Sequence, residues 1–203
     1  MRANSVQLFK ALLALSDLEH CQRFSQIAIS ELLSLPKAGK SAGPDHRIAL
    51  YSMLALVPPH EGVSTTLLQV TTPLLAKEAS EGVTAVLAAA LPRHIVFLLR
   101  YATLPPEITQ LIAKEIVNIK PAIRKTFVSL AGSIFFDNGD VLDTEKGLAF
   151  AQTLLPSLES CLTTVSSNPA NAAPCEGYVA IAVLLGPFVK SQKFGSLTFG
   201  VHT

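Results

Sequence analysis

The stretch Lys120-Pro-Ala-Ile-Arg-Lys-Thr-Phe-Val-Ser-Leu-Ala-Gly132 decides the fold class, because it carries a helix start and a helical face together. Pro121 suits the first position of a helix, where its missing N–H has no partner to lose. Apolar residues then recur at spacings of three and four, which places them along one helical face. These residues are Ile123, Phe127, Leu130, Ala131 and Ile134. The stretch therefore predicts an amphipathic helix that begins near Pro121.

The same combination of apolar spacing and punctuating proline recurs along most of the chain. Asp45 is expected to cap one helix, Pro73 to kink another, and Pro92 to bend or divide a third. No sustained alternation of apolar and polar residues occurs, so no β-sheet is expected. The predicted helices span residues 5–15, 24–35, 45–57, 63–75, 83–101, 105–119, 121–134, 147–162 and 178–189, with loops at 37–44, 137–143 and 163–174.

Pairs of these helices recur about every 40 residues, a period within the range of HEAT and armadillo units. We therefore predict an all-α chain that forms a HEAT/armadillo-like α-solenoid of stacked antiparallel helix pairs. The solenoid is expected over residues 1–191, as about four to five helix pairs, with a non-repeat tail at 192–203. The repeats share no identical motif, so a compact helical bundle stays open as an alternative. The last helical pattern has no partner after it, which suggests a segment of a longer protein.

The composition favours a globular chain that buries a substantial core. Hydrophobic residues make up 49% of the sequence, and the mean hydropathy is +0.42. Lys and Arg number 16 against 15 Asp and Glu, and a net charge of +1 creates no overall field that would draw nucleic acid or a membrane surface. Any basic binding site must therefore be local.

The cysteines and the start of the chain favour a cytoplasmic protein. Cys21, Cys161 and Cys175 are an odd number without a disulfide framework, which is typical of a reducing compartment. The first residues lack a basic segment followed by an apolar core and a cleavage site, so secretion is not expected. The most apolar runs, residues 83–91 and 178–189, are shorter than the about 20 residues that span a bilayer, so no membrane contact is expected.

Two patterns resemble ligand sites but lack a part that the chemistry needs. The loop that ends in residues 39–41, Gly-Lys-Ser, resembles the end of a phosphate-binding loop. However, Ser34 stands where that loop needs glycine, and no strand precedes it. The acidic run at 137–145 resembles a calcium loop, but Val141 and Leu142 occupy positions that need glycine and an oxygen ligand. Neither nucleotide nor calcium binding is expected.

The other titratable residues suggest no reaction centre. The five histidines are scattered without the close spacing that metal sites use. His20 and Cys21 point in different directions on a helix, so a surface histidine beside a buried thiol is expected. Asp143 or Thr144 is expected to cap the helix that follows the acidic run. We therefore expect no catalytic residue, no metal, no cofactor and no small-molecule substrate, in a protein that is not an enzyme.

The polar cluster most suited to a partner is Lys120, Arg124 and Lys125, with Lys114 one helix earlier. Lys120 and Arg124 are four residues apart and are therefore neighbours on a helix. This cluster is a candidate contact for a phosphate-rich partner. The alternative is that these charges solvate the outer face of the helix or pair with acidic residues of a neighbouring repeat. Aromatic residues, which base stacking would need, do not interleave with it.

The stretch from Lys120 to Gly132 resembles the HEAT-repeat pattern of proline, an apolar residue, arginine, and small and aliphatic residues that end near glycine. The resemblance implies that Arg124 reaches a loop carbonyl or a carboxylate of the adjoining repeat, while Ala131 and Gly132 allow close helix packing. Residues 45–54 are similar, with an aspartate in the turn and an arginine entering the helix.

The run Thr72-Pro-Leu-Leu-Ala-Lys-Glu78, followed by Glu81 and the apolar helix to His94, resembles the general control (Gcn-type) translational activator, a giant HEAT-repeat protein. The resemblance spans about residues 44–189. It implies a cytoplasmic protein that engages translating or stalled ribosomes and promotes activation of the kinase of the translation initiation factor two alpha subunit in the stress response. It also implies an ATP-binding-cassette partner, for which no contact residue carries over. Another HEAT-repeat adaptor, such as a transport receptor or a phosphatase scaffold, is the alternative.

Overall fold

The computed structural model describes residues 2–34 and 43–167, and within these ranges every regular element is helical. The helices are α1 (Arg2–Leu15), α2 (Leu18–Ser34), α3 (Pro44–Leu54), α4 (Glu61–Leu75), α5 (Glu81–Tyr101), α6 (Pro106–Glu115), α7 (Pro121–Phe136) and α8 (Glu145–Ser167), with a short 3₁₀ helix, η1 (Gly139–Asp143), before the last of them. The prediction of an all-α chain is confirmed for this part of the sequence.

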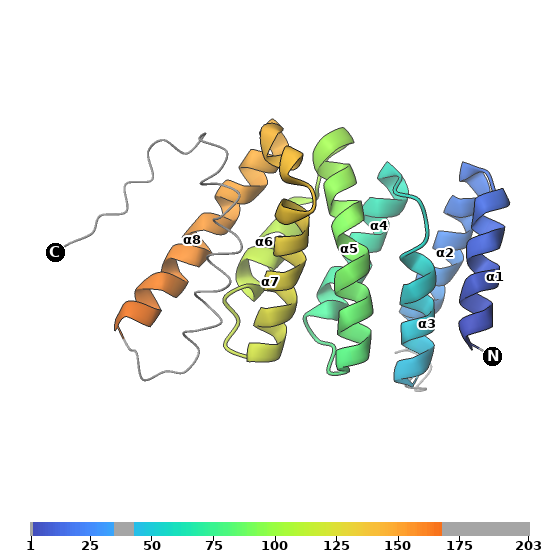
Figure 1. Ribbon diagram of the computed structural model, residues 1–203, viewed down its shortest axis with the longest axis horizontal. Helices are drawn as coiled ribbons and strands as arrows, with labels where there is room; N and C mark the ends of the chain where they lie inside the picture. The colour runs from blue at the N-terminus through green and yellow to red at the C-terminus, as the bar shows by residue number, and fades with distance from the viewer. Residues whose placement is uncertain (1, 35–42, 168–203) are drawn as a thin grey trace.

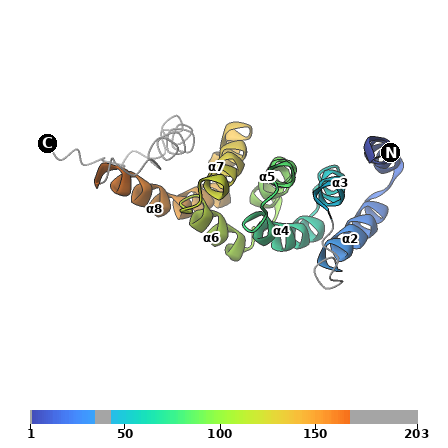
Figure 2. The ribbon, with the colours of Figure 1, turned by 90° about the horizontal axis from the view of Figure 1, so that it is seen from below.

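The helices stand side by side in a row that is two layers deep. Figure 1 shows the row from α1 at one end to α8 at the other. Seen from below, α1, α3, α5 and α7 lie in one layer, and α2, α4, α6 and α8 lie in the other (Figure 2). Packing follows this order, because α5 contacts α3 and α7 in its own layer and α4 in the other. Each helix therefore packs on near neighbours along the chain.

The hydrophobic core is centred on α5 and on the face of α7 that the sequence predicted. Leu91 and Ile95 of α5 are fully buried, and so are Phe127, Leu130 and Ile134 of α7. Each such side chain contributes about 1.5–3 kcal/mol when it leaves water. The apolar spacing after Pro121 was therefore a correct guide to the buried face of this helix.

Helix α5 is more continuous than expected. It runs undivided through the buried residue Pro92, so of the bend or division expected there the division does not occur. The resulting 21-residue helix is long and apolar enough to cross a membrane, by length and composition, with a mean hydropathy of 1.8 over 18 residues. The apolar run at 83–91 is shorter than the about 20 residues that span a bilayer, whereas the whole helix is not. More than half of that window, 56%, is buried inside the protein, which is typical of a core helix.

Polar side chains join residues of consecutive helix pairs. Five of these hydrogen bonds join residues 38 to 44 positions apart in sequence, and two further contacts join residues 30 and 31 positions apart. The five bonds run between Gln22 Nε2 and His60 Nδ1, from Gln69 Nε2 to Glu107 Oε1, from Arg93 Nη1 to the Ala55 carbonyl, from Arg100 Nη2 to the Asp140 carboxylate, and from Lys146 Nζ to the Ala102 carbonyl. A side chain thus meets a partner about one helix pair away, which agrees with the period of about 40 residues in the sequence.

The start of α3 differs from the prediction. Gly43 takes the capping position and Pro44 the first helical position, so Asp45 lies in the first turn and makes no cap. A carboxylate there still interacts favourably with the positive end of the helix dipole. The next helix, α4, continues through Pro73 as one helix, as expected.

The start of α8 was predicted correctly and its end was not. Thr144 Oγ1 accepts a hydrogen bond from the Gly147 N–H at 3.0 Å, so the expected cap at this threonine is confirmed. The helix continues to Ser167, into the loop expected at 163–174, because the threonines and serines there are tolerated in a helix. Of the loop predicted at 37–44, residues 37–42 lie outside the described residues, while Pro44 already belongs to α3. The predicted helix at 178–189 and tail at 192–203 also lie outside the described residues.

An ion pair joins α3 to the turn between α4 and α5. Arg47 donates to both carboxylate oxygens of Glu78, from Nε at 3.0 Å and from Nη2 at 2.9 Å. Glu78 Oε1 also accepts the backbone N–H groups of Ala79 and Ser80. The two side chains are only 23% and 12% exposed. The pair therefore fixes the position of one helix pair on the next.

We expect this pair to couple strongly in a double-mutant cycle of Arg47→Met and Glu78→Gln. Charge-assisted, two-point bonds that are shielded from water are among the stronger polar interactions, so the coupling in free energy of unfolding should be about 1–2 kcal/mol. Denaturant unfolding of the four variants measures it. Arg100 and Asp140 provide a matched pair in which the carboxylate is 65% exposed, and their coupling should stay below about 1 kcal/mol. Equal coupling in the two cycles would contradict the prediction.

Candidate functional site

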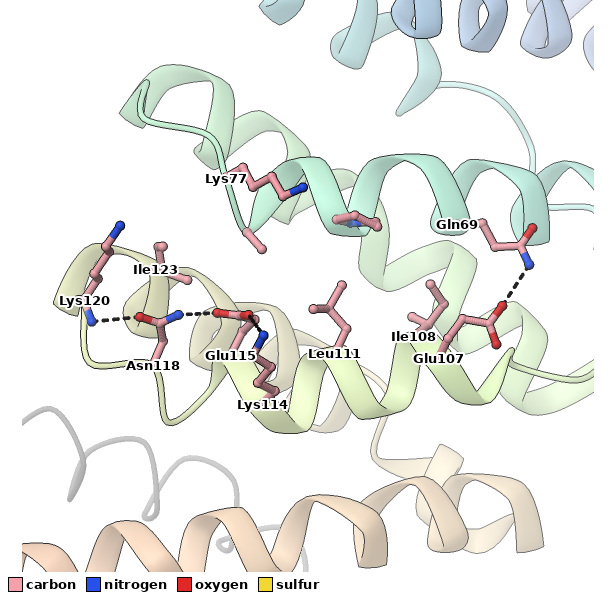
Figure 3. A pocket seen from close by; sticks show the side chains of 12 residues that line it. Gln69, Lys77, Glu107, Ile108, Leu111, Lys114, Glu115, Asn118, Lys120 and Ile123 are labelled. Atoms are coloured by element: carbon pink, nitrogen blue, oxygen red, sulfur yellow. Dashed lines mark hydrogen bonds and ion pairs between the residues drawn. The ribbon is translucent and has the colours of Figure 1, made fainter.

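A groove of about 670 Å³ lies between α4 and α6 and is open to solvent. Figure 3 shows the two helices running along its sides, with α7 at one end. Its apolar lining comes from Pro73 and Ala76 of α4, Ile108 and Leu111 of α6, and Ile123 of α7. Ile108 is buried, while the other four are partly exposed. The groove therefore offers an apolar surface that water still reaches.

One end of the groove is basic. Lys77 follows the end of α4, Lys114 lies in the last turn of α6, and Lys120 directly precedes α7. All three are exposed and line the groove. The carboxylate of Glu115 lies beneath them, and its Oε1 is 3.7 Å from Lys114 Nζ. Three ammonium groups against one buried carboxylate leave this end positive.

The turn between α6 and α7 is held by Asn118. Its side-chain amide donates to Glu115 Oε2, and its Oδ1 accepts the backbone N–H of Lys120 at 2.8 Å. Its backbone carbonyl accepts a hydrogen bond from Arg124 Nη1, also at 2.8 Å. Figure 3 shows this chain of contacts from Lys120 through Asn118 to Glu115. The basic end of the groove is therefore fixed by the fold.

The opposite end of the groove is acidic. Gln69 Nε2 donates to Glu107 Oε1 at 2.9 Å, which joins α4 to the first turn of α6. This hydrogen bond holds the pKa of the Glu107 carboxyl below its ordinary value. Glu107 is therefore ionised at neutral pH, and the groove has a positive and a negative end.

The structure separates the residues that the sequence grouped as one basic cluster. Lys120 and Lys125 are exposed, and Lys120 lines the groove. Arg124 is only 6% exposed and donates to the carbonyl of Asn118. The expected bond to a loop carbonyl is therefore present, and the loop is the turn that joins α6 to α7. Only the two lysines present their charges on the surface.

Sequence reasoning missed Lys77, Gln69 and Glu107 as members of a site. They lie far from the basic cluster in sequence, and the stacking of one helix pair on the next brings them to it. The period of about 40 residues was the available signal, because Lys77 lies about one period before Lys114 and Lys120.

The remaining titratable candidates lie outside the groove. His20 is exposed and its Nδ1 lies 2.6 Å from Asp17 Oδ1, whereas Cys21 is 3% exposed, so the expected surface histidine and buried thiol are confirmed. In the residues described, no group of three or more His, Cys, Asp or Glu side chains could hold a metal ion. His94 is fully buried, and its Nδ1 lies 2.9 Å from Ser64 Oγ.

Comparison with known proteins identifies a family to which the sequence is similar. The family model described as General control nonderepressible 1 (Gcn1) N-terminal matches residues 44–199, which is most of the chain. The matched range begins at the first residue of α3 and includes every residue that lines the groove. No curated protein and no solved structure matches the sequence.

Proposed function

The chain belongs to the Gcn1 N-terminal family, and from this premise we propose that it is a scaffold segment of a translational activator. The resemblance to a Gcn-type activator, expected over residues 44–189, is confirmed by a match that begins at the same residue. This family match is the observation that carries the proposal. The proposed segment is cytoplasmic and acts through protein partners rather than by catalysis.

The architecture that we infer is a HEAT-type solenoid. In a compact bundle the first and last helices would pack around a common centre, whereas here α1 and α8 lie at opposite ends of the row (Figure 1). The hydrogen bonds between residues 38 to 44 positions apart support stacking of similar units. Such an array presents an extended surface on which partners can be held side by side.

We propose that the segment contributes to contact with ribosomes, and through the longer protein to activation of the kinase of initiation factor two alpha. The exposed charges of Lys120 and Lys125 are the surface that we assign to ribosomal contact. An ATP-binding-cassette protein is a further proposed partner of the longer protein. In this scheme the segment links ribosome contact to kinase activation by holding the bound partners close together. It takes no part in a chemical reaction.

Co-sedimentation of the chain with purified ribosomes at increasing salt tests this function. The variant Lys120→Glu/Lys125→Glu removes the two exposed charges and leaves the buried Arg124 in place. Binding should weaken about tenfold or more, and the slope of log affinity against log salt should fall by about two. The double variant Lys10→Glu/Arg23→Glu makes the same change in charge on α1 and α2 and should bind like the original chain.

Two results would count against the proposal. Absence of the original chain from the ribosomal pellet at low salt would exclude ribosomal contact by this segment. Equal losses in the two double variants would mean that net charge, rather than the surface at the start of α7, determines binding.

A further inference from the structure

We propose that the groove between α4 and α6 is a docking site for a short acidic segment of a partner protein that carries an aliphatic side chain. This inference goes beyond ribosomal contact, because it stands on the groove alone. It concerns a different partner class from ribosomal RNA. An occupant could bind without separating α4 from α6, since most of the apolar lining is already partly open to water.

The size of the groove suits a peptide. Its volume of about 670 Å³ falls within the range of about 300–1,000 Å³ that is typical of ligand sites. The 10 residues of α6 run along one side, which corresponds to a length of about 15 Å. About four or five residues of extended chain would cover that length. The turn held by Asn118 fixes one end, so little ordering is needed when a segment binds.

The middle of the groove fits an aliphatic side chain. Leu111 and Ile123 are partly exposed, and Ile108 is buried between the helices. Figure 3 shows Ile108 and Leu111 pointing from α6 toward α4. A leucine of the partner would bury its surface against them at about 25 cal/mol per Å².

The charges determine which segment fits. Lys77, Lys114 and Lys120 attract a carboxylate at one end, and Glu107 would repel one at the other. The asymmetry therefore sets the direction of the bound segment. Nucleic acid fits less well, because none of the described residues that line the groove is aromatic and Glu107 would face the phosphate backbone.

Fluorescence anisotropy with the full 203-residue chain tests the proposal. The probe is a fluorescein-labelled peptide with two aspartates followed by two leucines and with no charged residue on the other side of the leucines, and a second peptide has lysines in place of the aspartates. The aspartate peptide should bind at least about tenfold more tightly. The variant Lys77→Glu/Leu111→Gln should weaken its binding by about tenfold or more. The variant Lys10→Glu/Leu8→Gln makes the same changes at exposed positions of α1 and should bind normally.

Each alternative result overturns the proposal. Equal binding of the two peptides would exclude charge recognition, and equal losses in the two variants would exclude the groove as the site. Tighter binding of a labelled single-stranded oligouridine that displaces the peptide would assign the groove to RNA.

Thermal unfolding of each variant shows that it is folded. Because the assay contains no ribosomes and changes neither Lys120 nor Lys125, its failure is distinct from failure of the ribosomal proposal.

Discussion

Replacement of Gly147 by alanine should lower the free energy of unfolding by about 3 kcal/mol. A Cβ at this position would lie 2.0 Å from the carbonyl oxygen of Val141 and 2.8 Å from its carbonyl carbon. These are backbone atoms of η1, so no change of side-chain rotamer can relieve the overlap. The first turn of α8 would have to move away from η1, and the hydrogen bond from the Gly147 N–H to Thr144 would be strained or lost.

The chain offers a matched control for this change at another glycine in the first turn of a helix. Gly62, near the start of α4, has nothing within 4 Å of where its Cβ would be. Gly62→Ala should therefore raise the stability, by up to about 1 kcal/mol, because alanine loses less backbone freedom on folding. Denaturant unfolding of both variants measures the two effects. If Gly147→Ala were as stable as Gly62→Ala, the close packing of α8 on η1 would be wrong.

Acidification should destabilise the protein through His94. Burial, and then the positive charge of Arg93, lowers the pKa of this histidine from 6.5 to about 4. Between these two values the unfolded chain binds a proton that the folded chain does not. The contribution of His94 to stability is therefore complete above pH 6.5 and is lost as the pH falls toward 4. The loss should reach about 3 kcal/mol, because each unit of pKa difference corresponds to about 1.4 kcal/mol.

Thermal or denaturant unfolding at several pH values between 7 and 4.5 measures this dependence. Other carboxylates and histidines also titrate in this range, so the useful quantity is the difference between the original chain and His94→Gln. That variant cannot take up the proton, and its stability should fall less steeply with pH. A His94→Gln variant with the original pH dependence would contradict the assignment.

The sequence predicted the features of the fold that depend on local chemistry. Proline at the first position and apolar spacing of three and four are properties of one segment, so the start and the buried face of α7 were both correct. The effect of Pro92 depends on the surroundings, because α5 packs against α3, α4 and α7 on different sides. Packing from three helices holds the helix together where its own sequence favours a break.

The candidate site was predictable in part. The lysine at 120 was recognised because it lies beside other basic residues in sequence. The same spacing could not show that Arg124 turns inward to bind the Asn118 carbonyl. The inward position of Arg124 on α7 depends on the turn before that helix. The side-chain amide of Asn118 holds this turn, and helical spacing alone does not show it. Gln69 and Glu107 meet only through stacking of separate helix pairs, so no local pattern joined them.

The side chains that join neighbouring helix pairs lie 30 to 44 residues apart in sequence, and this short separation has a consequence for biosynthesis. A helix pair can complete these bonds as soon as about one further unit has left the ribosomal exit tunnel, without waiting for the distant end of the chain. At the usual elongation rates of about 5–20 residues per second, that delay is a few seconds. The nascent chain can therefore fold progressively from its N-terminal end, and each newly formed pair covers the exposed apolar side of the pair made before it.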